Sequence, residues 1–240
     1  MEKPLVAITG ATSGIGLKTA LRFSEAGYPL LLMGRHLEKL KSFALPNVMI
    51  KHVDVTNIDM IKSAITEAES QYGPMDCLLN VAGMMLLGDI GTQNPQEWHL
   101  MLEVNILGVL NGMQAVLPNM KKRQQGTIIN VSSIAGIKPF AHHAAYVGTK
   151  FAVHGLTDNV REEVASDNIR VMIVAPGAVE TPLLSHTSSD QIKVKYEAWK
   201  KSIGGVLGAE DVARVMLYAY EQPQNVCLRE IVLSSTKQSA

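Results

Sequence analysis

The sequence of 240 residues has few cysteines and no excess of charge of either sign. Its two cysteines, Cys77 and Cys227, match neither a CxxC motif nor a zinc-ligand spacing, so we expect two free thiols, no disulfide and no metal site. Lysine and arginine number 22, as do aspartate and glutamate. Proteins that bind nucleic acids usually carry a basic excess, so the balanced charge argues against that class and against a polybasic membrane-binding segment.

Long apolar runs are also missing. No unbroken apolar stretch approaches the ~18–20 residues that cross a bilayer. The apolar stretch near the start, residues 5–8, is shorter than the ~7–15-residue core of a secretory signal. Hydrophobic residues nevertheless make up 47% of the chain, enough for a buried core. With no repeat or linker-like segment, the sequence predicts one cytoplasmic domain over residues 1–240, without membrane contact.

Short apolar segments alternate with helix-like segments along the chain. The predicted strands are residues 5–9, 30–33, 48–53, 77–80, 127–131, 169–174 and 230–233, and the predicted helices are 14–27, 57–72, 98–120, 144–166 and 209–220. Strands that are apolar on both faces are typical of parallel sheets covered by helices. The pattern therefore predicts an α/β fold with a doubly wound, Rossmann-like parallel sheet and helices on both faces. Residues 182–208 show no regular pattern, and we expect them to form a mobile flap over the substrate.

A glycine-rich segment, TGATSGIG at residues 9–16, follows the first predicted strand and leads into a helix. Glycine permits tight turns and close approach of the backbone to a ligand, and free N–H groups at a helix start bind phosphate. The segment therefore predicts a site for a dinucleotide diphosphate. A plain strand-to-helix turn is the alternative, because a glycine-rich loop is by itself a weak signal.

Two charged residues follow the next strands. Sites for NAD usually place an acidic residue after the second strand to bind the ribose 2′-hydroxyl, but this chain has Arg35 there. A guanidinium suits a 2′-phosphate, so Arg35 favours NADP (NADPH) over NAD, although an exposed arginine at this position is common. Asp54, followed by Val55, either accepts a hydrogen bond from the adenine amino group or caps the next helix.

The candidate catalytic residues are Ser133, Tyr146, Lys150 and Asn105. Tyr146 and Lys150 lie one turn apart at the start of a predicted helix, so they share a face. An ammonium close to a phenol lowers the pKa of that phenol and makes it a better acid–base catalyst. Ser133 follows a predicted strand, and Asn105 is an amide within an apolar helix. A YxxxK pair alone also fits the start of an ordinary amphipathic helix.

Taken together with Asn80-Val81-Ala82-Gly83 and the Pro176-Gly177 pair, these motifs resemble those of the short-chain dehydrogenase/reductase family, in order and spacing, over essentially the full chain. The resemblance implies that Tyr146 exchanges a proton with the substrate oxygen, assisted by Lys150, while Ser133 polarises the carbonyl and Asn105 holds a relay water. It also implies a set of residues around the cofactor. These are Gly10, Ser13, Gly14, Ile15 and Gly16 at the diphosphate, Asn80, Ala82 and Gly83 beside the adenosine and ribose, Tyr146 and Lys150 at the nicotinamide ribose, and Pro176, Gly177, Val179 and Thr181 at the nicotinamide.

Two departures bear on the substrate. Val81 replaces the second asparagine of the family's N-N-A-G motif, and the last strand lacks the Gly-Gly segment of many members. That ending, together with residues 208–213, resembles the branch of NADP-dependent 3-hydroxy acid and serine dehydrogenases. The flap carries Lys193, Lys195, Lys200 and Lys201, which fit either an anionic substrate or a solvated helix face. The pair His142-His143 is typical of a loop rather than of a metal site.

The sequence therefore predicts an NADP-dependent oxidoreductase that transfers a hydride between the nicotinamide and a secondary alcohol or ketone, with a 3-hydroxy acid as one candidate substrate. The alternatives are a non-catalytic NADPH-binding sensor or scaffold, and an epimerase or dehydratase on the same fold. The resemblance also implies a homodimer or homotetramer that pairs residues 98–120 and 144–166 across its interface. We expect no partner besides a small-molecule carbonyl or alcohol substrate and other copies of the chain.

Overall fold

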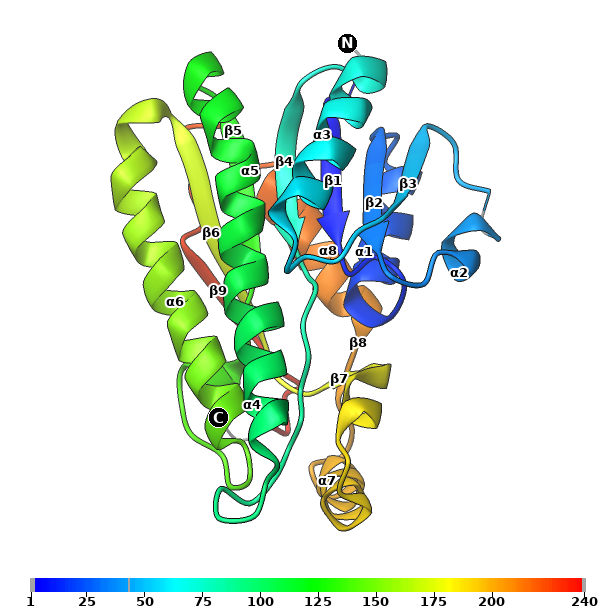
Figure 1. Ribbon diagram of the computed structural model, residues 1–240, viewed down its shortest axis with the longest axis vertical. Helices are drawn as coiled ribbons and strands as arrows, with labels where there is room; N and C mark the ends of the chain where they lie inside the picture. Colours follow the sequence, from blue (N-terminus) through cyan, green and yellow to red (C-terminus); the bar gives the residue numbers. More distant parts are fainter. Residues whose placement is uncertain (1–2, 43, 239–240) are drawn as a thin grey trace.

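The computed structural model describes residues 3–42 and 44–238, and it is built around a seven-stranded parallel sheet (Figure 1). The strands are β1 (Leu5–Thr9), β2 (Leu30–Gly34), β3 (Val48–His52), β4 (Met75–Asn80), β5 (Gly126–Val131), β6 (Ile169–Pro176) and β9 (Glu230–Leu233). Their order is β3-β2-β1-β4-β5-β6-β9. The order reverses between β1 and β4, and ligands bind at such a reversal, beyond the carboxyl ends of the strands. The predicted doubly wound α/β fold is confirmed.

Helices cover both faces of this sheet (Figure 1). One face carries α1 (Gly14–Glu25) and α8 (Ala209–Tyr220), and the other carries α3 (Ile58–Tyr72), α5 (Gly108–Arg123) and α6 (Ala144–Val164). Alternate residues of β1 serve the two sides: Leu5 and Ala7 pack under α3 and α5, whereas Val6 and Ile8 pack under α1 and α8. Because both sides are buried, the strand is apolar throughout, as parallel strands generally are.

The long helix predicted at residues 98–120 is longer in the structure and not uniform. It consists of α4 (Pro95–Leu102), the π-helical turn η1 (Glu103–Leu107) and α5. Its start is fixed by Asn94, whose side chain accepts a hydrogen bond from the N–H of Gln96, and by Pro95 in the first turn. It ends where Gln124 adopts a left-handed conformation with φ of 54°.

The helix Pro95–Arg123 is long and apolar enough to cross a membrane by length and composition, and an 18-residue window within it has a mean hydropathy of 1.5. It holds no long unbroken apolar run, because Glu103, Asn105 and Asn111 interrupt it. A core helix of a globular protein passes the same test, and this stretch packs against α3, β4, β5 and α6. It is weak evidence for a membrane span, so the absence of membrane contact stays a prediction.

The flap expected to be irregular, residues 182–208, is largely helical. It contains the 3₁₀ turn η4 (Pro182–His186) and α7 (Asp190–Ser202), and a two-stranded parallel ladder, β7 (Val179–Glu180) with β8 (Leu207–Gly208), closes its base. Ser189 caps α7 by accepting a hydrogen bond from the N–H of Ile192. The expected irregular structure was wrong, because the few apolar residues of α7 recur at helical spacing among many polar ones and pack against the cavity and a small apolar cluster. The expected mobility of the flap stays a prediction.

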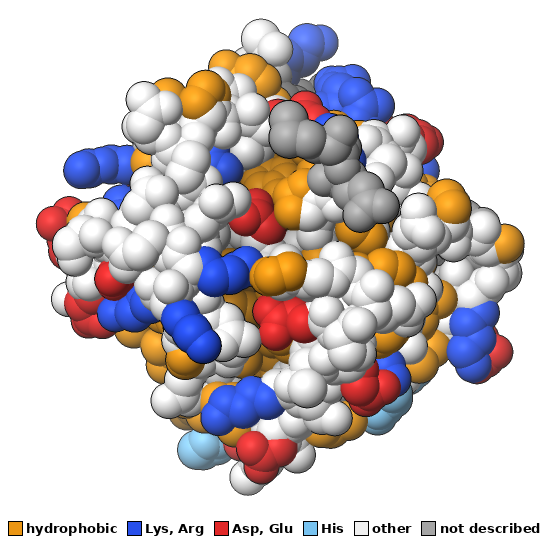
Figure 2. All heavy atoms as spheres, turned by 90° about the horizontal axis from the view of Figure 1, so that it is seen from above, with side chains coloured by type: hydrophobic (Ala, Val, Ile, Leu, Met, Phe, Trp, Pro, Cys, Tyr) orange, Lys and Arg blue, Asp and Glu red, His pale blue; other side chains and the backbone are white. Residues whose placement is uncertain are grey.

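The state of the cysteines and the distribution of surface charge agree with what the composition predicts. Cys77 and Cys227 are free, as predicted. On the face at the amino ends of the strands, opposite α7, acidic and basic side chains are interspersed (Figure 2). That face therefore carries no large patch of one sign.

Candidate active site

A cavity of about 540 Å³ lies beyond the carboxyl ends of the central strands. The glycine-rich loop forms one end and the flap closes the other. The predicted site residues that line it are Gly10, Ser13, Gly14, Ile15, Gly16, Arg35, Asp54, Val55, Ala82, Gly83, Ser133, Tyr146, Lys150, Pro176, Gly177, Val179 and Thr181. Asn80 and Asn105 are not among them. The structure thus brings all but two of the predicted residues to one cavity.

The glycine-rich loop folds tightly against the end of β4. Gly10 has φ of +65°, and a Cβ added there would lie 2.7 Å from the Cα of Ala82. A Cβ on Gly16 would lie 2.2 Å from the carbonyl oxygen of Gly10. Neither position tolerates a side chain, so the glycines are required by packing as well as by the turn.

The start of α1 is left open to the cavity. Ser13 makes no side-chain cap, and the first turn holds no acidic residue. The N–H groups of that turn and the helix dipole therefore favour an anion at this point. This set of donors fits the diphosphate of a dinucleotide cofactor, with no acidic side chain to oppose it.

Thr9 supports this loop and was missed as a site residue. Its buried hydroxyl oxygen accepts hydrogen bonds from the N–H groups of Val81 and Ala82, at 3.0 and 3.1 Å. The contact joins the end of β1 to the segment after β4, where the strand order reverses. Threonine within an apolar strand, directly before a glycine-rich turn, was the available signal.

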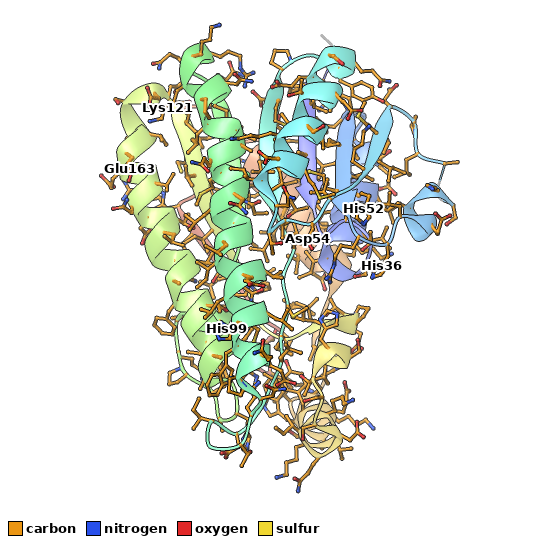
Figure 3. The ribbon with its side chains drawn as sticks, viewed as in Figure 1. His36, His52, Asp54, His99, Lys121 and Glu163 are labelled. Atoms are coloured by element: carbon orange, nitrogen blue, oxygen red, sulfur yellow. The ribbon has the colours of Figure 1, made fainter. Side chains whose placement is uncertain are left out.

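The end of the cavity beside β2 and β3 is polar. His36 and Asp54 line it, and His52 is the last residue of β3. All three lie at the carboxyl ends of these strands, whereas Lys121 and Glu163 lie on the outer helices (Figure 3). Arg35 is exposed and lines the cavity. Arg35, and not an acidic residue, stands directly after β2, so a guanidinium is available to a phosphate at this position.

The side chain of Asp54 stabilises the turn that follows β3. Its Oδ1 accepts hydrogen bonds from the N–H of Thr56 at 3.0 Å and from the Thr56 hydroxyl at 2.8 Å. These bonds, from the backbone above all, lower the pKa of Asp54, and the charge of Arg35 adds to them. Asn57, rather than Asp54, caps α3 through bonds from the N–H groups of Asp59 and Met60. Asp54 lines the cavity as well, so its turn role leaves the adenine role open.

Asn80 lies behind the cavity wall rather than in it. Its side chain is 2% exposed, and its Nδ2 donates to Oδ1 of Asn130 at 2.9 Å. A Cβ on Gly112 would meet Asn80 Oδ1 at 2.4 Å, so α5 covers this side chain closely. The side chain forms a buried amide pair between β4 and β5, and the strand ends one residue before the cavity begins. The predicted place of Asn80 beside the cofactor stays a prediction.

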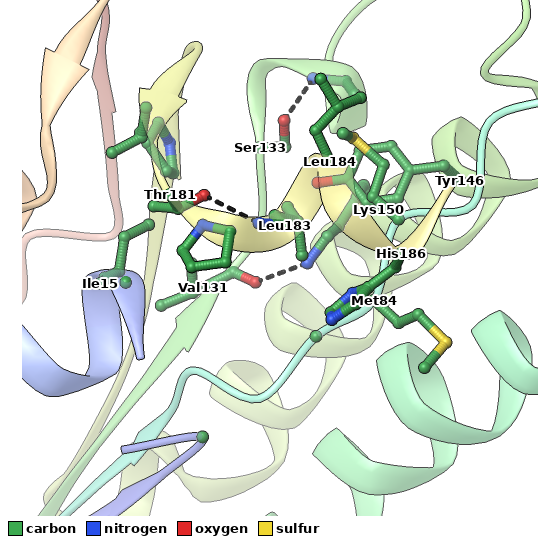
Figure 4. Close-up of a pocket in the computed structure, with 18 of the residues that line it drawn as sticks. Ile15, Met84, Val131, Ser133, Tyr146, Lys150, Thr181, Leu183, Leu184 and His186 are labelled. Atoms are coloured by element: carbon green, nitrogen blue, oxygen red, sulfur yellow. Dashed lines mark hydrogen bonds between the residues drawn. The ribbon is translucent and has the colours of Figure 1, made fainter. Parts of the chain in front are cut away.

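Three side chains predicted to surround the substrate oxygen lie together in the cavity, and these are Ser133, Tyr146 and Lys150 (Figure 4). Ser133 follows β5, and its hydroxyl also accepts the N–H of Ala135 at 3.1 Å. Tyr146 lies in the first turn of α6, 6% exposed. Burial raises the pKa of Tyr146, and a hydrogen bond with Ser133 opposes that rise.

Lys150 lies one turn further along α6. Its ammonium donates to the carbonyl oxygen of Val131 at 3.0 Å and stands 5.7 Å from the centre of the Tyr146 ring. Burial lowers the pKa of Lys150 to about 8. The ammonium is hydrogen bonded to the backbone of Val131 rather than to the phenol of Tyr146. The electrostatic role of Lys150 toward Tyr146 stays a prediction.

Asn105 sits within the π-helical turn η1 and is 1% exposed. Its Oδ1 accepts the N–H of Met84 at 2.8 Å, and its Nδ2 donates to the Met84 carbonyl at 2.8 Å and to the Thr149 hydroxyl at 3.0 Å. Both amide protons are therefore used within the protein. The side chain ties the segment after β4 to α6 rather than lining the cavity, and the relay water at Asn105 stays a prediction.

The flap contributes residues that the sequence analysis did not select. Leu183, Leu184 and His186 of η4, and Ile192, Tyr196 and Trp199 of α7, all line the cavity. The spacing of the last three, at i, i+4 and i+7, is a helical signal that could have found them. Thr187 fixes the flap: its buried hydroxyl accepts the N–H of Leu87 at 3.1 Å and donates to the carbonyl of Met85 at 3.3 Å.

Histidines near the cavity do not assemble a metal site. Over residues 3–42 and 44–238, no group of three His, Cys, Asp or Glu side chains is placed to hold a metal ion. The Nδ1 of His143 lies 2.6 Å from the carbonyl oxygen of Ala141, which gives this ring a local role.

Comparisons with known proteins agree with this geometry. A family model described as short chain dehydrogenase matches residues 4–192. An uncharacterized oxidoreductase of Staphylococcus saprophyticus is 37% identical over 245 aligned positions, covering 100% of this chain and 98% of the relative.

Solved structures give the same result. The closed form of serine dehydrogenase complexed with NADP⁺ has a TM-score of 0.90 and 28% identity, covering 98% of this chain and 96% of that one. An alcohol dehydrogenase from the archaeon Thermococcus sibiricus, complexed with 5-hydroxy-NADP, has a TM-score of 0.86 and 25% identity, covering 100% and 99%. The chain therefore belongs to the short-chain dehydrogenase family and is an oxidoreductase of that family.

Proposed function

We propose that this oxidoreductase uses NADP (NADPH) to interconvert a secondary alcohol and a ketone. The observation that carries the proposal is that Ser133, Tyr146 and Lys150 meet in one cavity with an uncapped helix start and Arg35. The solved relatives named above were complexed with NADP⁺ and 5-hydroxy-NADP, which supports the cofactor assignment.

The residues of this chain divide the work by position. The N–H groups at the start of α1 would hold the diphosphate, Arg35 the 2′-phosphate, and the segment after β6 the nicotinamide end. When bound, the nicotinamide supplies the hydride chemistry. The protein supplies orientation and proton transfer at the substrate oxygen.

Tyr146 is the proton donor in reduction and the acceptor in oxidation. Its phenol is already hydrogen bonded to Ser133, so one carbonyl oxygen can accept hydrogen bonds from both hydroxyl groups. Because burial holds the Tyr146 phenol in its neutral form, the resting site is prepared to donate a proton, as reduction requires. The flap and Thr187 would shield this step from water.

Replacement of Tyr146 by Phe tests the proposal. We expect turnover of a ketone panel to fall by at least about a thousandfold, because the proton donor is lost. Binding of NADPH, followed by its fluorescence, should stay within about threefold. Tyr218→Phe is a matched control, since it removes the same hydroxyl from a tyrosine that is 61% exposed on α8 and does not line the cavity. Turnover that survives Tyr146→Phe would refute the assignment.

Location and assembly complete the proposal. We place the protein in the cytoplasm and expect a homodimer or homotetramer. Leu107 of η1 and Phe151 of α6 are 49% and 45% exposed, and apolar side chains of this size on neighbouring helices suit an interface between copies. Size-exclusion chromatography with light scattering measures the assembly.

A further inference from the structure

The end of the cavity beyond Tyr146 is lined by a row of aromatic rings. The ring centre of His143 lies 5.7 Å from that of Phe140, 6.3 Å from Tyr146 and 6.1 Å from Tyr196. Tyr196 in turn lies 5.3 Å from Trp199. Such a row offers flat apolar surface to a substrate ring.

Aliphatic side chains form other parts of this wall. Met84 follows β4, Leu183 and Leu184 come from η4, and Ile192 comes from α7. All four are partly buried and pack around the small core of Met85, Leu87, Met101 and Tyr146. Figure 4 shows Met84, Leu183 and Leu184 around the same space as Tyr146. A substrate at this end meets carbon surface on several sides.

Two of the four lysines of the flap are held in ion pairs. Lys200 contacts Glu180 and Glu197, each at 2.9 Å, and Lys193 contacts Asp190 at 2.7 Å. Lys195 lines the cavity but is exposed on α7, and Lys201 does not line it. A carboxylate bound beyond Tyr146 would therefore meet the exposed ammonium of Lys195 and that of Lys138, which stands 5.2 Å from the centre of the Phe140 ring. Solvated ammonium groups of this kind hold an anion weakly.

His143 does not supply the missing charge. Its Nδ1 lies 2.6 Å from the Ala141 carbonyl, so this nitrogen carries the proton and donates it. Burial lowers the pKa of His143, which keeps the ring neutral at pH 7. It serves as part of the aromatic wall and not as an anion-binding group.

We infer that the substrate is a bulky, uncharged ketone or secondary alcohol with an aromatic or alicyclic ring, rather than a small hydroxy acid. The inference rests on the proposed function for the location of the reacting oxygen at Ser133 and Tyr146. The ring of the substrate packs against the wall that Tyr196, His143, Met84 and Leu184 form.

Binding of two matched probes tests the substrate class. 1-Acetonaphthone and 1-naphthoate share the same ring and differ in a ketone against a carboxylate. Their binding to the Tyr146→Phe variant loaded with NADPH is followed by NADPH fluorescence, so no turnover is needed. We expect acetonaphthone to bind at least tenfold more tightly. Equal binding, or tighter binding of naphthoate, overturns the inference.

Substitutions then locate the ring. Tyr196→Ala and Leu184→Ala, each made in the Tyr146→Phe background, should weaken acetonaphthone binding about tenfold while NADPH affinity stays within threefold. Lys195→Gln should change binding of either probe by less than twofold, like Lys201→Gln, which alters the same charge outside the cavity. A tenfold loss of naphthoate binding in Lys195→Gln alone would assign that lysine to an anionic substrate and overturn the inference.

The two proposals fail in different ways. If the wild-type protein binds acetonaphthone but does not oxidise NADPH with it or with other ring ketones, the proposed reaction is wrong and the apolar site stands. If the wild-type protein turns over 3-hydroxy acids with NADP and prefers them to ring alcohols, the reaction stands and the substrate class is wrong.

Discussion

Burial of the Lys150 ammonium makes the stability of the protein depend on pH. The pKa of Lys150 falls from its ordinary 10.5 to about 8 because the side chain is buried. Between these two values the unfolded chain holds a proton that the folded protein has released. Since stability rises with pH wherever the unfolded state binds more protons, this lysine destabilises the fold below pH 8 and ceases to do so as the pH approaches 10.5.

The magnitude follows from the same pKa. Each pKa unit is worth about 1.4 kcal/mol, so raising the pH from 7 to 9.5 should recover about 2 kcal/mol of the free energy of unfolding. Lys150→Met removes the titration. The wild-type free energy of unfolding, minus that of the variant, should therefore rise by about 2 kcal/mol over this interval, and pH-independent effects of the substitution cancel.

Urea unfolding of both proteins without cofactor, at half-unit steps between pH 7 and 9.5, measures this difference. Lys18→Met, which removes an exposed lysine from α1, is the control for a change in net charge. A difference that stays constant within about 0.5 kcal/mol would refute burial as the cause. Lys150→Met should also lose turnover. That loss would show that the protein keeps the destabilising charge of Lys150 because the active site needs it.

Three further predictions concern the cofactor end and the flap. Arg35→Asp should raise the Kd for NADP about a hundredfold and that for NAD less than threefold, because charge-assisted bonds to a phosphate are worth about 1.5–3 kcal/mol each; parallel titrations measure both, and equal losses would exclude the 2′-phosphate role. Thr9→Val should lower the free energy of unfolding by about 2–4 kcal/mol, since two N–H groups lose their acceptor, while Thr9→Ser keeps most of it; identical losses in urea would show that the hydroxyl is not the cause. Thr187→Val should raise KM and speed proteolysis within the flap, with Thr187→Ser as the rescue, because it cuts the bonds to Leu87 and Met85; unchanged proteolysis would contradict that anchoring role.

Several features of the fold could be predicted from the sequence because local signals agree with tertiary ones. The bounds of β1, β9 and α8 are those predicted from apolar runs and helical spacing. The glycine-rich loop was predicted from its spacing, and the structure shows why the spacing is needed: side chains at Gly10 or Gly16 would collide with backbone.

Other features depend on tertiary contacts that the sequence does not show. Asn80 and Asn105 belong to recognisable motifs, but their amides are bonded within the protein rather than open to the cavity. A motif shows which residue type stands at the end of a strand or inside a helix. It does not show which way an amide turns or which neighbour satisfies it, and that depends on the packing of β5 and α6.

The sequence by itself predicted the parallel sheet, the glycine-rich loop and the candidate reacting groups. Each depends on residues close together in the chain, through strand pattern, turn geometry or helix spacing. The tertiary structure alone decided the character of the substrate site. Met84, His143, Leu184 and Tyr196 come from four separate segments, so their common wall arises only when the flap packs over the sheet. The ion pair between Lys200 and Glu180 likewise forms only because α7 meets β7, and it neutralises a lysine that the sequence alone leaves available to an anion.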